Sequence, residues 1–314
     1  NHTASLGKGW GCLHETQDQR AMTAPITAFS AVALSAEDLP ELIARAYAVF
    51  DSERPRPVHI SVPLDVLSAK VIRDWSNEVV RRPSRGVPSD TVLDQAVAKL
   101  RNAKRPMIIA GGGALNAQQQ VHELSTRLAA PLFTSVAGKG LLPPHAPLNA
   151  GSTLWVEPGW QFIAEADVVL AVGTEMAETD FWRERLPLNA ELLRLDIDPR
   201  KFNDFYPCAV GLQGDAQHTL AALLERLAPV QRDASAAIAA IARLRDDVQA
   251  GHGPLQSIHQ AILERIAAEL PDDAFISPDM TQLAYTGNYA FNSLAPRSWL
   301  HPTGYGTLGY GLPA

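Results

Sequence analysis

A glycine-rich stretch near the end of the chain has the composition of a ligand-binding segment. Residues 301–314 read His-Pro-Thr-Gly-Tyr-Gly-Thr-Leu-Gly-Tyr-Gly-Leu-Pro-Ala, with four glycines among the eight residues 304–311. Because glycine has no side chain, a ligand can approach such a backbone closely. Leu308 is the aliphatic residue between these glycines and would press on that ligand. The same composition also fits a flexible turn, so both readings stay open here.

A second glycine cluster, residues 111–113, follows the apolar run Arg105-Pro106-Met107-Ile108-Ile109-Ala110. A glycine-rich turn between a strand and a helix is one way to bind a dinucleotide. The spacing is not G-x-G-x-x-G, however, and Asp167 lies too far along the chain to contact a ribose. The pattern therefore favours a tight strand-to-helix turn over dinucleotide binding.

Composition excludes several classes of protein. The 314 residues carry a formal charge of -7, which argues against nucleic acid as the main partner. No apolar run reaches the roughly 18 residues of a membrane span, and no signal peptide opens the chain. The two cysteines, Cys12 and Cys208, are too few and too far apart for a disulfide scaffold or a zinc site. We expect a cytoplasmic protein without membrane contact and without a metal site of its own.

The two ends of the chain predict a fragment. The sequence starts at Asn1 without a methionine, and it stops at Ala314 where a helix is about to begin. We expect the chain to be a piece of a longer protein.

Alternating apolar strands and helical patterns predict an α/β fold with a parallel sheet covered on both faces. We expect three domains: a Rossmann-like central domain that is complete, and partial domains at both ends. The boundaries are 1–68, a linker 69–89, the central domain 90–228, a linker 229–253 with an alanine-rich helix, and 254–314. Residues 1–35 are expected to be irregular. The expected strands are 56–63, 105–110, 131–136, 167–173, 191–198, 209–212 and 274–279, and the expected helices are 36–50, 91–102, 117–128, 216–227 and 254–270.

Arg81 and Arg82 in the first linker allow two interpretations. A doublet of arginines is compatible with an anion site, but charge runs are usually solvated, and we favour a solvated crossover.

Several motifs in register resemble one enzyme family. The pattern Gly306-x-Leu308-Gly309-x-Gly311-Leu312-Pro313-Ala314 resembles a segment of the thiamine-diphosphate enzymes of the acetolactate synthase and 2-oxo acid decarboxylase superfamily. The resemblance spans essentially the whole chain, and its other motifs are residues 25–27, 57–66, 105–113, 138–140, 167–173, 196–199 and 279–282.

The resemblance implies roles for particular residues. The backbone carbonyl of Gly306 would accept a hydrogen bond from the aminopyrimidine of thiamine diphosphate, and Leu308 would lie beneath the cofactor and hold it bent. Thr281 and Gln282 match positions near the diphosphate. His14 matches a catalytic loop position that faces the reacting centre from another subunit, which implies a homodimer or homotetramer. A solvated loop histidine is the alternative for His14.

Two parts of the family's site have no counterpart in the sequence. The activating glutamate would precede residue 1, and the motif that holds Mg²⁺ would follow residue 314. We therefore expect the 314 residues alone to be inactive. FAD is also unlikely on this resemblance, because Glu175, Glu178 and Asp180 stand where FAD-binding relatives have basic groups.

The leading interpretation is a decarboxylase that acts on a small 2-oxo acid with thiamine diphosphate and Mg²⁺. The loop His14-Glu15-Thr16-Gln17-Asp18-Gln19 and the run Gly173-Thr174-Glu175 look most like a guanidino-oxo-acid decarboxylase, with 5-guanidino-2-oxopentanoate as substrate. The alternatives are an acetolactate synthase-like carboligase and a non-catalytic nucleotide-binding regulatory module or structural relic.

Overall fold

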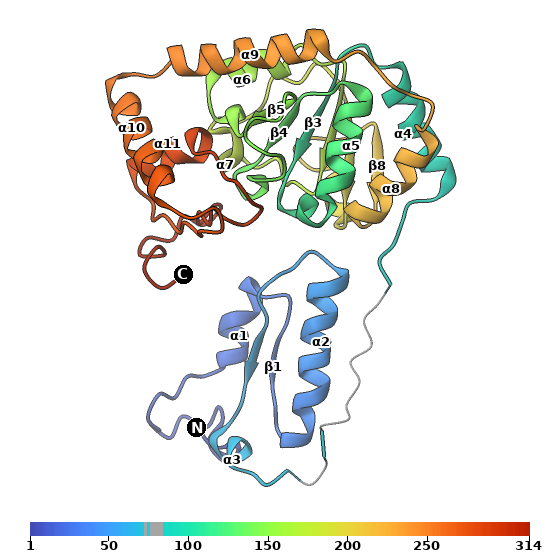
Figure 1. Ribbon diagram of the computed structural model, residues 1–314. Helices are drawn as coiled ribbons and strands as arrows, with labels where there is room; N and C mark the ends of the chain where they lie inside the picture. Colours follow the sequence, from blue (N-terminus) through green and yellow to red (C-terminus); the bar gives the residue numbers. More distant parts are fainter. Residues whose placement is uncertain (72–73, 76–83) are drawn as a thin grey trace. The chain divides into compact units, whose positions relative to one another are not determined.

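The chain folds into two compact units, residues 1–85 and 86–314 (Figure 1). The computed structural model describes residues 1–71, 74–75 and 84–314. Arg81 and Arg82, and most of the predicted linker 69–89, lie outside the described residues. No helix in the described ranges is both long and apolar enough to cross a lipid bilayer.

The first unit contains a two-stranded parallel sheet, in which Ser30 of β1 pairs with His59 of β2. Its elements are α1 (Gln19–Thr23), β1 (Ser30–Val32), α2 (Leu39–Ser52), β2 (His59–Ser61) and α3 (Leu64–Leu67). The expectation that residues 1–35 are irregular is wrong, since α1 and β1 lie there. β1 is stabilised by a partner far away in sequence, which a local pattern cannot reveal. Ser35 and Asp38 form the reciprocal capping box that their spacing predicts.

The second unit contains a six-stranded parallel sheet in the order β5-β4-β3-β6-β7-β8. The strands are β3 (Pro106–Ala110), β4 (Leu132–Thr134), β5 (Asn149–Gly151), β6 (Val168–Val172), β7 (Glu191–Asp196) and β8 (Val210–Gln213). All residues of β3 and β6 are buried, which explains why their sequences are continuously apolar rather than alternating. The predicted parallel sheet is confirmed.

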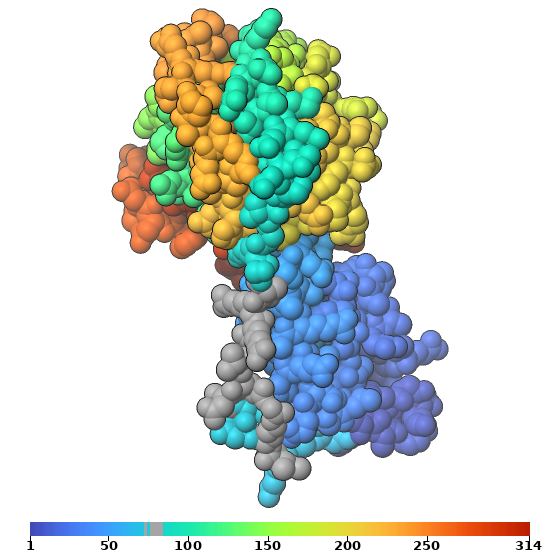
Figure 2. Space-filling model, turned by 90° about the vertical axis from the view of Figure 1, so that its right-hand side faces the viewer, coloured from blue at the N-terminus to red at the C-terminus, as the bar shows by residue number. Residues whose placement is uncertain are grey.

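Helices cover both faces of this sheet, because successive strand residues point to opposite sides. Ile108 and Leu170 face a core that is completed by α4 (Asp90–Asn102), α5 (Gln118–Leu128) and α8 (Ala216–Arg226). Figure 2 shows α4, in teal, lying beside α8 on the surface of this unit. In α4, Leu93, Ala96, Val97 and Leu100 recur at helical spacing and are buried.

The opposite face of the sheet packs on α6 (Glu157–Ile163) and α9 (Ser235–Ala250). Ile109 and Val169 point to this side. Ile241 and Leu244 of α9 are buried in the same core. The alanine-rich helix of the predicted linker 229–253 therefore forms part of the layer that covers the sheet.

The C-terminal segment packs on the sheet domain within the same unit. It contains α10 (Pro254–Glu269) and α11 (Gln282–Ala290), whose residues share a small core with Trp155 of the short 3₁₀ helix η6 (Thr153–Trp155). The predicted strand 274–279 is wrong: the structure has an isolated bridge between Ile276 and Trp299 at this place. The run has the composition of a strand, but no neighbouring strand pairs with it in the described part of the chain. The proposed domain boundaries remain predictions.

The motif Gly138-Lys139-Gly140 connects the sheet domain to this C-terminal segment. The buried ammonium group of Lys139 donates to the carbonyl oxygens of Gly287 (3.3 Å), Asn288 (3.1 Å) and Phe291 (2.7 Å) at the end of α11. A cation at a helix C-terminus satisfies its last carbonyl groups and interacts favourably with the helix dipole. Burial acts in the opposite direction and lowers the pKa of Lys139 to about 7.

Candidate functional site

The carboxylate of Asp279 holds the glycine-rich segment against the start of α11. It accepts hydrogen bonds from the backbone N–H groups of Met280 (2.7 Å), Gly309 (3.1 Å) and Gly311 (3.2 Å). The hydrogen bonds from Met280 and then Gly311 hold the pKa of Asp279 below its usual range. An ionised carboxylate therefore joins two stretches of chain that lie about 30 residues apart.

Two of the glycines are required for different physical reasons. Gly306 has φ of 67°, in the left-handed region that other residues rarely adopt. At Gly311 a Cβ atom would lie 2.9 Å from the carbonyl oxygen of Ser277 and 3.0 Å from the amide nitrogen of Asp279. A side chain at position 311 would push the segment away from Asp279.

Four of the five residues predicted for the site gather around this carboxylate. Thr281 caps α11 by accepting from the N–H group of Ala284 (3.2 Å), and Gln282 is the exposed first residue of the helix. Gly306 lies against Met280, and Leu308 directly precedes Gly309, which donates to Asp279. Leu308 is 76% exposed, so it is not a core residue of the described structure and its side chain is accessible to a ligand.

His14, the fifth predicted residue, lies in the first unit, in an exposed loop, with φ of 59°. The loop is organised by its neighbour Glu15, whose carboxylate accepts from the N–H groups of Gly9 (2.8 Å) and Cys12 (3.0 Å). The catalytic role of His14 stays a prediction.

Two buried polar atoms without a partner lie near Asp279. In the described part of the chain, Ser277 Oγ and His301 Nδ1 are buried and make no hydrogen bond. Burial lowers the pKa of His301, although the negative charge of Asp279 opposes this shift. Unsatisfied buried groups cost free energy, so a bound molecule that contacts them would recover it. The first N–H groups of α11 also lack intrahelical partners, as at any helix N-terminus, and suit an anion. These groups fit a phosphorylated cofactor.

A metal site is not formed by the described residues. No group of three or more His, Cys, Asp or Glu side chains is placed to hold an ion within residues 1–71, 74–75 and 84–314.

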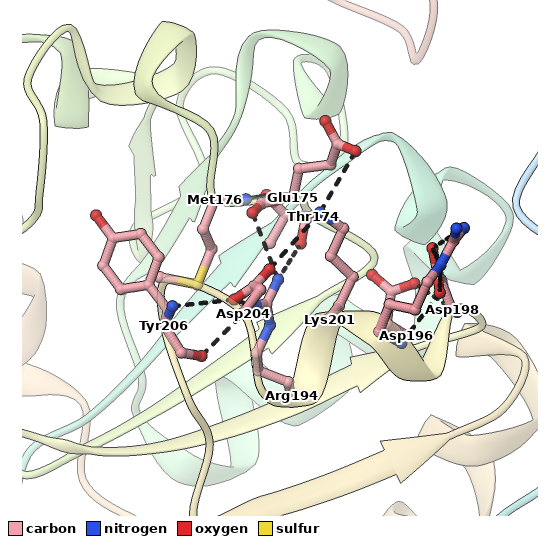
Figure 3. Close-up of polar contacts among 10 residues, drawn as sticks. Thr174, Glu175, Met176, Arg194, Asp196, Asp198, Lys201, Asp204 and Tyr206 are labelled. Carbon is pink, nitrogen blue, oxygen red and sulfur yellow. Dashed lines mark hydrogen bonds and ion pairs between the residues drawn. The ribbon is translucent and has the colours of Figure 1, made fainter. Parts of the chain in front are cut away.

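A separate polar network surrounds Arg194 on β7 (Figure 3). The guanidinium group is 1% exposed and donates to Asp204 Oδ1 (2.7 Å) and to the carbonyl oxygen of Thr174 (3.0 Å). Arg194 occupies a core-facing position between Leu192 and Asp196, so its charge must be paired. It fixes the loops that follow β6 and β7. Lys201 lies near both Glu175 (3.7 Å) and Asp204 (3.6 Å).

Comparison with known proteins identifies the family of the sheet domain. Residues 93–223 match the family described as "Thiamine pyrophosphate enzyme, central domain". These residues form a thiamine pyrophosphate enzyme central domain. They include all six strands of the sheet, α4 from Leu93 onward, and α8 up to Leu223.

Three curated relatives match beyond this thiamine pyrophosphate enzyme domain. A protein of Pseudomonas aeruginosa named "Probable 2-ketoarginine decarboxylase AruI" is 75% identical over all 314 residues, which are 56% of its own length. The acetolactate synthase isozyme 1 large subunit of Escherichia coli is 28% identical over 302 residues, covering 95% of this chain and 53% of the relative. A sulfoacetaldehyde acetyltransferase of Roseovarius nubinhibens is 28% identical over 294 residues, covering 82% of this chain and 48% of the relative. The chain thus spans about half the length of the curated relatives it matches.

Sequence reasoning missed two residues that organise the candidate site. Asp279 was part of a recognised motif, but its role appears only when the chain returns at residues 309–311. Lys139 lies between two glycines, and this pattern was the available signal that its backbone packs closely against another segment.

Proposed function

We propose that the protein is a thiamine-diphosphate-dependent 2-oxo acid decarboxylase whose substrate is 2-ketoarginine, 5-guanidino-2-oxopentanoate. The observation that carries the proposal is the segment held by Asp279, with orphaned buried polar groups beside it. The relative that is 75% identical is named as a probable decarboxylase of this substrate. In the reaction the bond between C1 and C2 breaks, CO₂ leaves, and a proton takes its place to give an aldehyde.

The residues of this chain have distinct roles in the proposal. The Gly306 carbonyl would accept a hydrogen bond from the aminopyrimidine ring of the cofactor, and Leu308 would contact the cofactor and hold it in position. Thr281 and Gln282 lie at the helix end where the diphosphate binds. When bound, thiamine diphosphate supplies the electron sink for the carbanion, while the protein supplies orientation and desolvation.

Mg²⁺, the assembly and the compartment are further parts of the proposal. We propose that Mg²⁺ accompanies the diphosphate, since a divalent cation neutralises phosphate charge. We also propose a cytoplasmic homodimer or homotetramer, in which His14 faces the reacting centre of another subunit. No FAD is expected, because acidic side chains at Glu175, Glu178 and Asp180 disfavour a second bound anion.

The assays use the longer protein that we expect to contain these 314 residues, and titration of that protein tests the cofactor assignment. Thiamine diphosphate with Mg²⁺ is expected to quench tryptophan fluorescence saturably, while thiamine without phosphates binds far more weakly. Decarboxylation of 2-ketoarginine is then followed by CO₂ release at saturating cofactor. Saturable binding of an adenine nucleotide without any thiamine diphosphate binding would instead favour the regulatory module.

Carboligation is the second candidate, because the relative from Escherichia coli that is 28% identical is an acetolactate synthase large subunit. Product analysis with pyruvate separates the two. A decarboxylase releases acetaldehyde or leaves pyruvate unreacted, whereas a carboligase forms acetolactate. A yellow protein with stoichiometric flavin would contradict the expectation of no FAD.

A further inference from the structure

Three aromatic rings pack against one another where the sheet domain meets α11. Trp155 and Trp182 stack with ring centroids 5.0 Å apart and planes 14° apart. Tyr285 lies 5.8 Å from Trp182 and 6.4 Å from Trp155. We call these three residues the aromatic cluster. They come from η6, from the residue that ends α7 (Glu178–Phe181) and from α11. η6 contacts both helices, and Figure 1 shows α7 near α11.

Trp182 adopts a left-handed backbone conformation. It is a bulky residue with φ of 50°, an uncommon and costly backbone state for such a side chain. Its N–H group donates to the carbonyl oxygen of Glu178 (2.7 Å), which helps to hold this turn. Although one face stacks on the buried Trp155, Trp182 remains 56% exposed. The turn therefore presents an open indole face to a ligand.

An acidic side chain accompanies the aromatic cluster. The carboxyl group of Asp180 lies near the backbone of Val136, and the Asp180 N–H group donates to the carbonyl oxygen of Ala177 (3.0 Å). Val136 packs in the same small core as Trp155. Asp180 therefore lies close to the small core that contains Trp155, two residues before Trp182.

The aromatic cluster also lies beside the proposed cofactor segment. Tyr285 is one turn into α11, and its N–H group donates to the carbonyl oxygen of Thr281 (3.0 Å). The Tyr285 ring is 6.1 Å from the ring of His301, which feels the charge of Asp279. A ligand on the aromatic cluster would therefore be a neighbour of a cofactor bound near Asp279.

We infer that the aromatic cluster binds the guanidinium end of the 2-oxo acid substrate, with the cation stacked on Trp182 and Asp180 supplying negative charge nearby. The inference rests on the proposed function for its substrate. A guanidinium group is planar and weakly hydrated, so it stacks well on indole and phenol rings. A neutral alkyl tail would bury apolar area on the same rings but would gain no cation–π attraction. The aromatic cluster therefore discriminates by charge as well as by shape.

Steady-state kinetics of the holoenzyme test this assignment with Trp182→Ala. We expect kcat/KM for 2-ketoarginine to fall about 10- to 30-fold, mainly through KM, because a desolvated cation–π contact has about this effect. For 2-oxohexanoate, which has an uncharged tail, we expect a change of no more than about twofold. Trp182→Phe keeps an aromatic face and is expected to recover most of the loss. Phe205→Ala is the matched control, since Phe205 is an aromatic residue with 54% exposure outside the aromatic cluster.

An equal loss for both substrates, or no loss for 2-ketoarginine, would overturn the inference. Asp180→Asn is a second test if Trp182→Ala does not fold. This substitution preserves the shape of the side chain, and we again expect kcat/KM to fall selectively for the guanidino substrate. If the wild-type longer protein that contains these residues decarboxylates neither acid, the proposed function fails. Calorimetric binding of 4-guanidinobutanoate against hexanoate still tests the aromatic cluster in that case, and preference for the guanidino probe that Trp182→Ala removes would support it. Absence of that preference would refute it.

Discussion

Replacing Lys139 by methionine tests whether one buried ammonium group attaches the C-terminal segment to the sheet domain. Methionine has nearly the same length but cannot donate to the carbonyl oxygens of Gly287, Asn288 and Phe291. A net hydrogen bond contributes about 1 kcal/mol, and carbonyl groups left buried without a partner add a penalty of similar size. At pH 7 we therefore expect Lys139→Met to lower the free energy of unfolding of residues 86–314 by about 2–4 kcal/mol.

The pH dependence of this loss has a definite sign. The pKa of Lys139 is lowered by burial from 10.5 to about 7 in the folded protein. Between these pH values the unfolded chain binds a proton that the folded chain does not, so the stability of the wild type rises with pH. One pKa unit corresponds to about 1.4 kcal/mol, which sets an upper limit of about 5 kcal/mol for the whole interval. The variant lacks this slope, so its deficit grows from pH 6 to pH 9.

Urea unfolding followed by tryptophan fluorescence is a suitable assay, because the Lys139 ammonium lies 5.7 Å from the ring of Trp299. Lys104→Met is the control: it makes the same substitution at an exposed position, where a change within about 0.5 kcal/mol is expected. A deficit that is the same at pH 6 and pH 9 would show that the three carbonyl groups keep Lys139 charged throughout. No deficit at either pH would refute its role as an attachment point.

Three further predictions concern the candidate site and its surroundings. Asp279→Asn removes the charge that holds Gly309 and Gly311, so we expect weaker thiamine diphosphate binding, by about 10-fold, measured by fluorescence titration. Leu308→Ala is expected to lower kcat by about 100-fold while cofactor affinity changes little, because the residue positions the cofactor; an unchanged kcat would exclude it from the site. Burial raises the pKa of Asp180 to about 6, so its ionisation destabilises the fold as the pH rises from about 4 to about 6. Asp180→Asn should reduce this dependence of stability on pH, measured by thermal melts at pH 4, 5, 6 and 7. An unchanged pH dependence would contradict the raised pKa of Asp180.

The sheet of the second unit could be predicted because its strands carry their own signal. β3 and β6 are buried along their whole length and are therefore apolar at every position. α11 carries no such signal, since Gly287 and Asn288 are poor helix formers. It is stabilised from outside: Lys139 caps its end, and a Cβ at Gly287 would collide with the Trp299 ring. Local propensity cannot report contacts of this kind.

The candidate site likewise combines residues that the sequence predicts with residues whose roles depend on distant contacts. Gly306 and Leu308 could be selected because glycine spacing is visible in the sequence. Asp279 could not be assigned a function in the same way, because its carboxylate acts on N–H groups about 30 residues further along the chain. The left-handed backbone of Trp182 also has no sequence signal, as tryptophan is not a residue that favours such a turn.

The attachment at residues 138–140 restricts how this chain can be recombined with its relatives. A Cβ at Gly138 would collide with the carbonyl group of Ala110, and a Cβ at Gly140 with that of Ala295. Gly140 and Lys139 thus belong structurally to the C-terminal segment, although more than 100 residues separate them from it in sequence. In a chimera with a crossover between α9 and α10, residues 138–140 of this chain would have to pack against the C-terminal segment of another protein. Exchanging residues 138–140 and Trp155 together with residues 254–314 would keep the two contacting surfaces matched in the chimera.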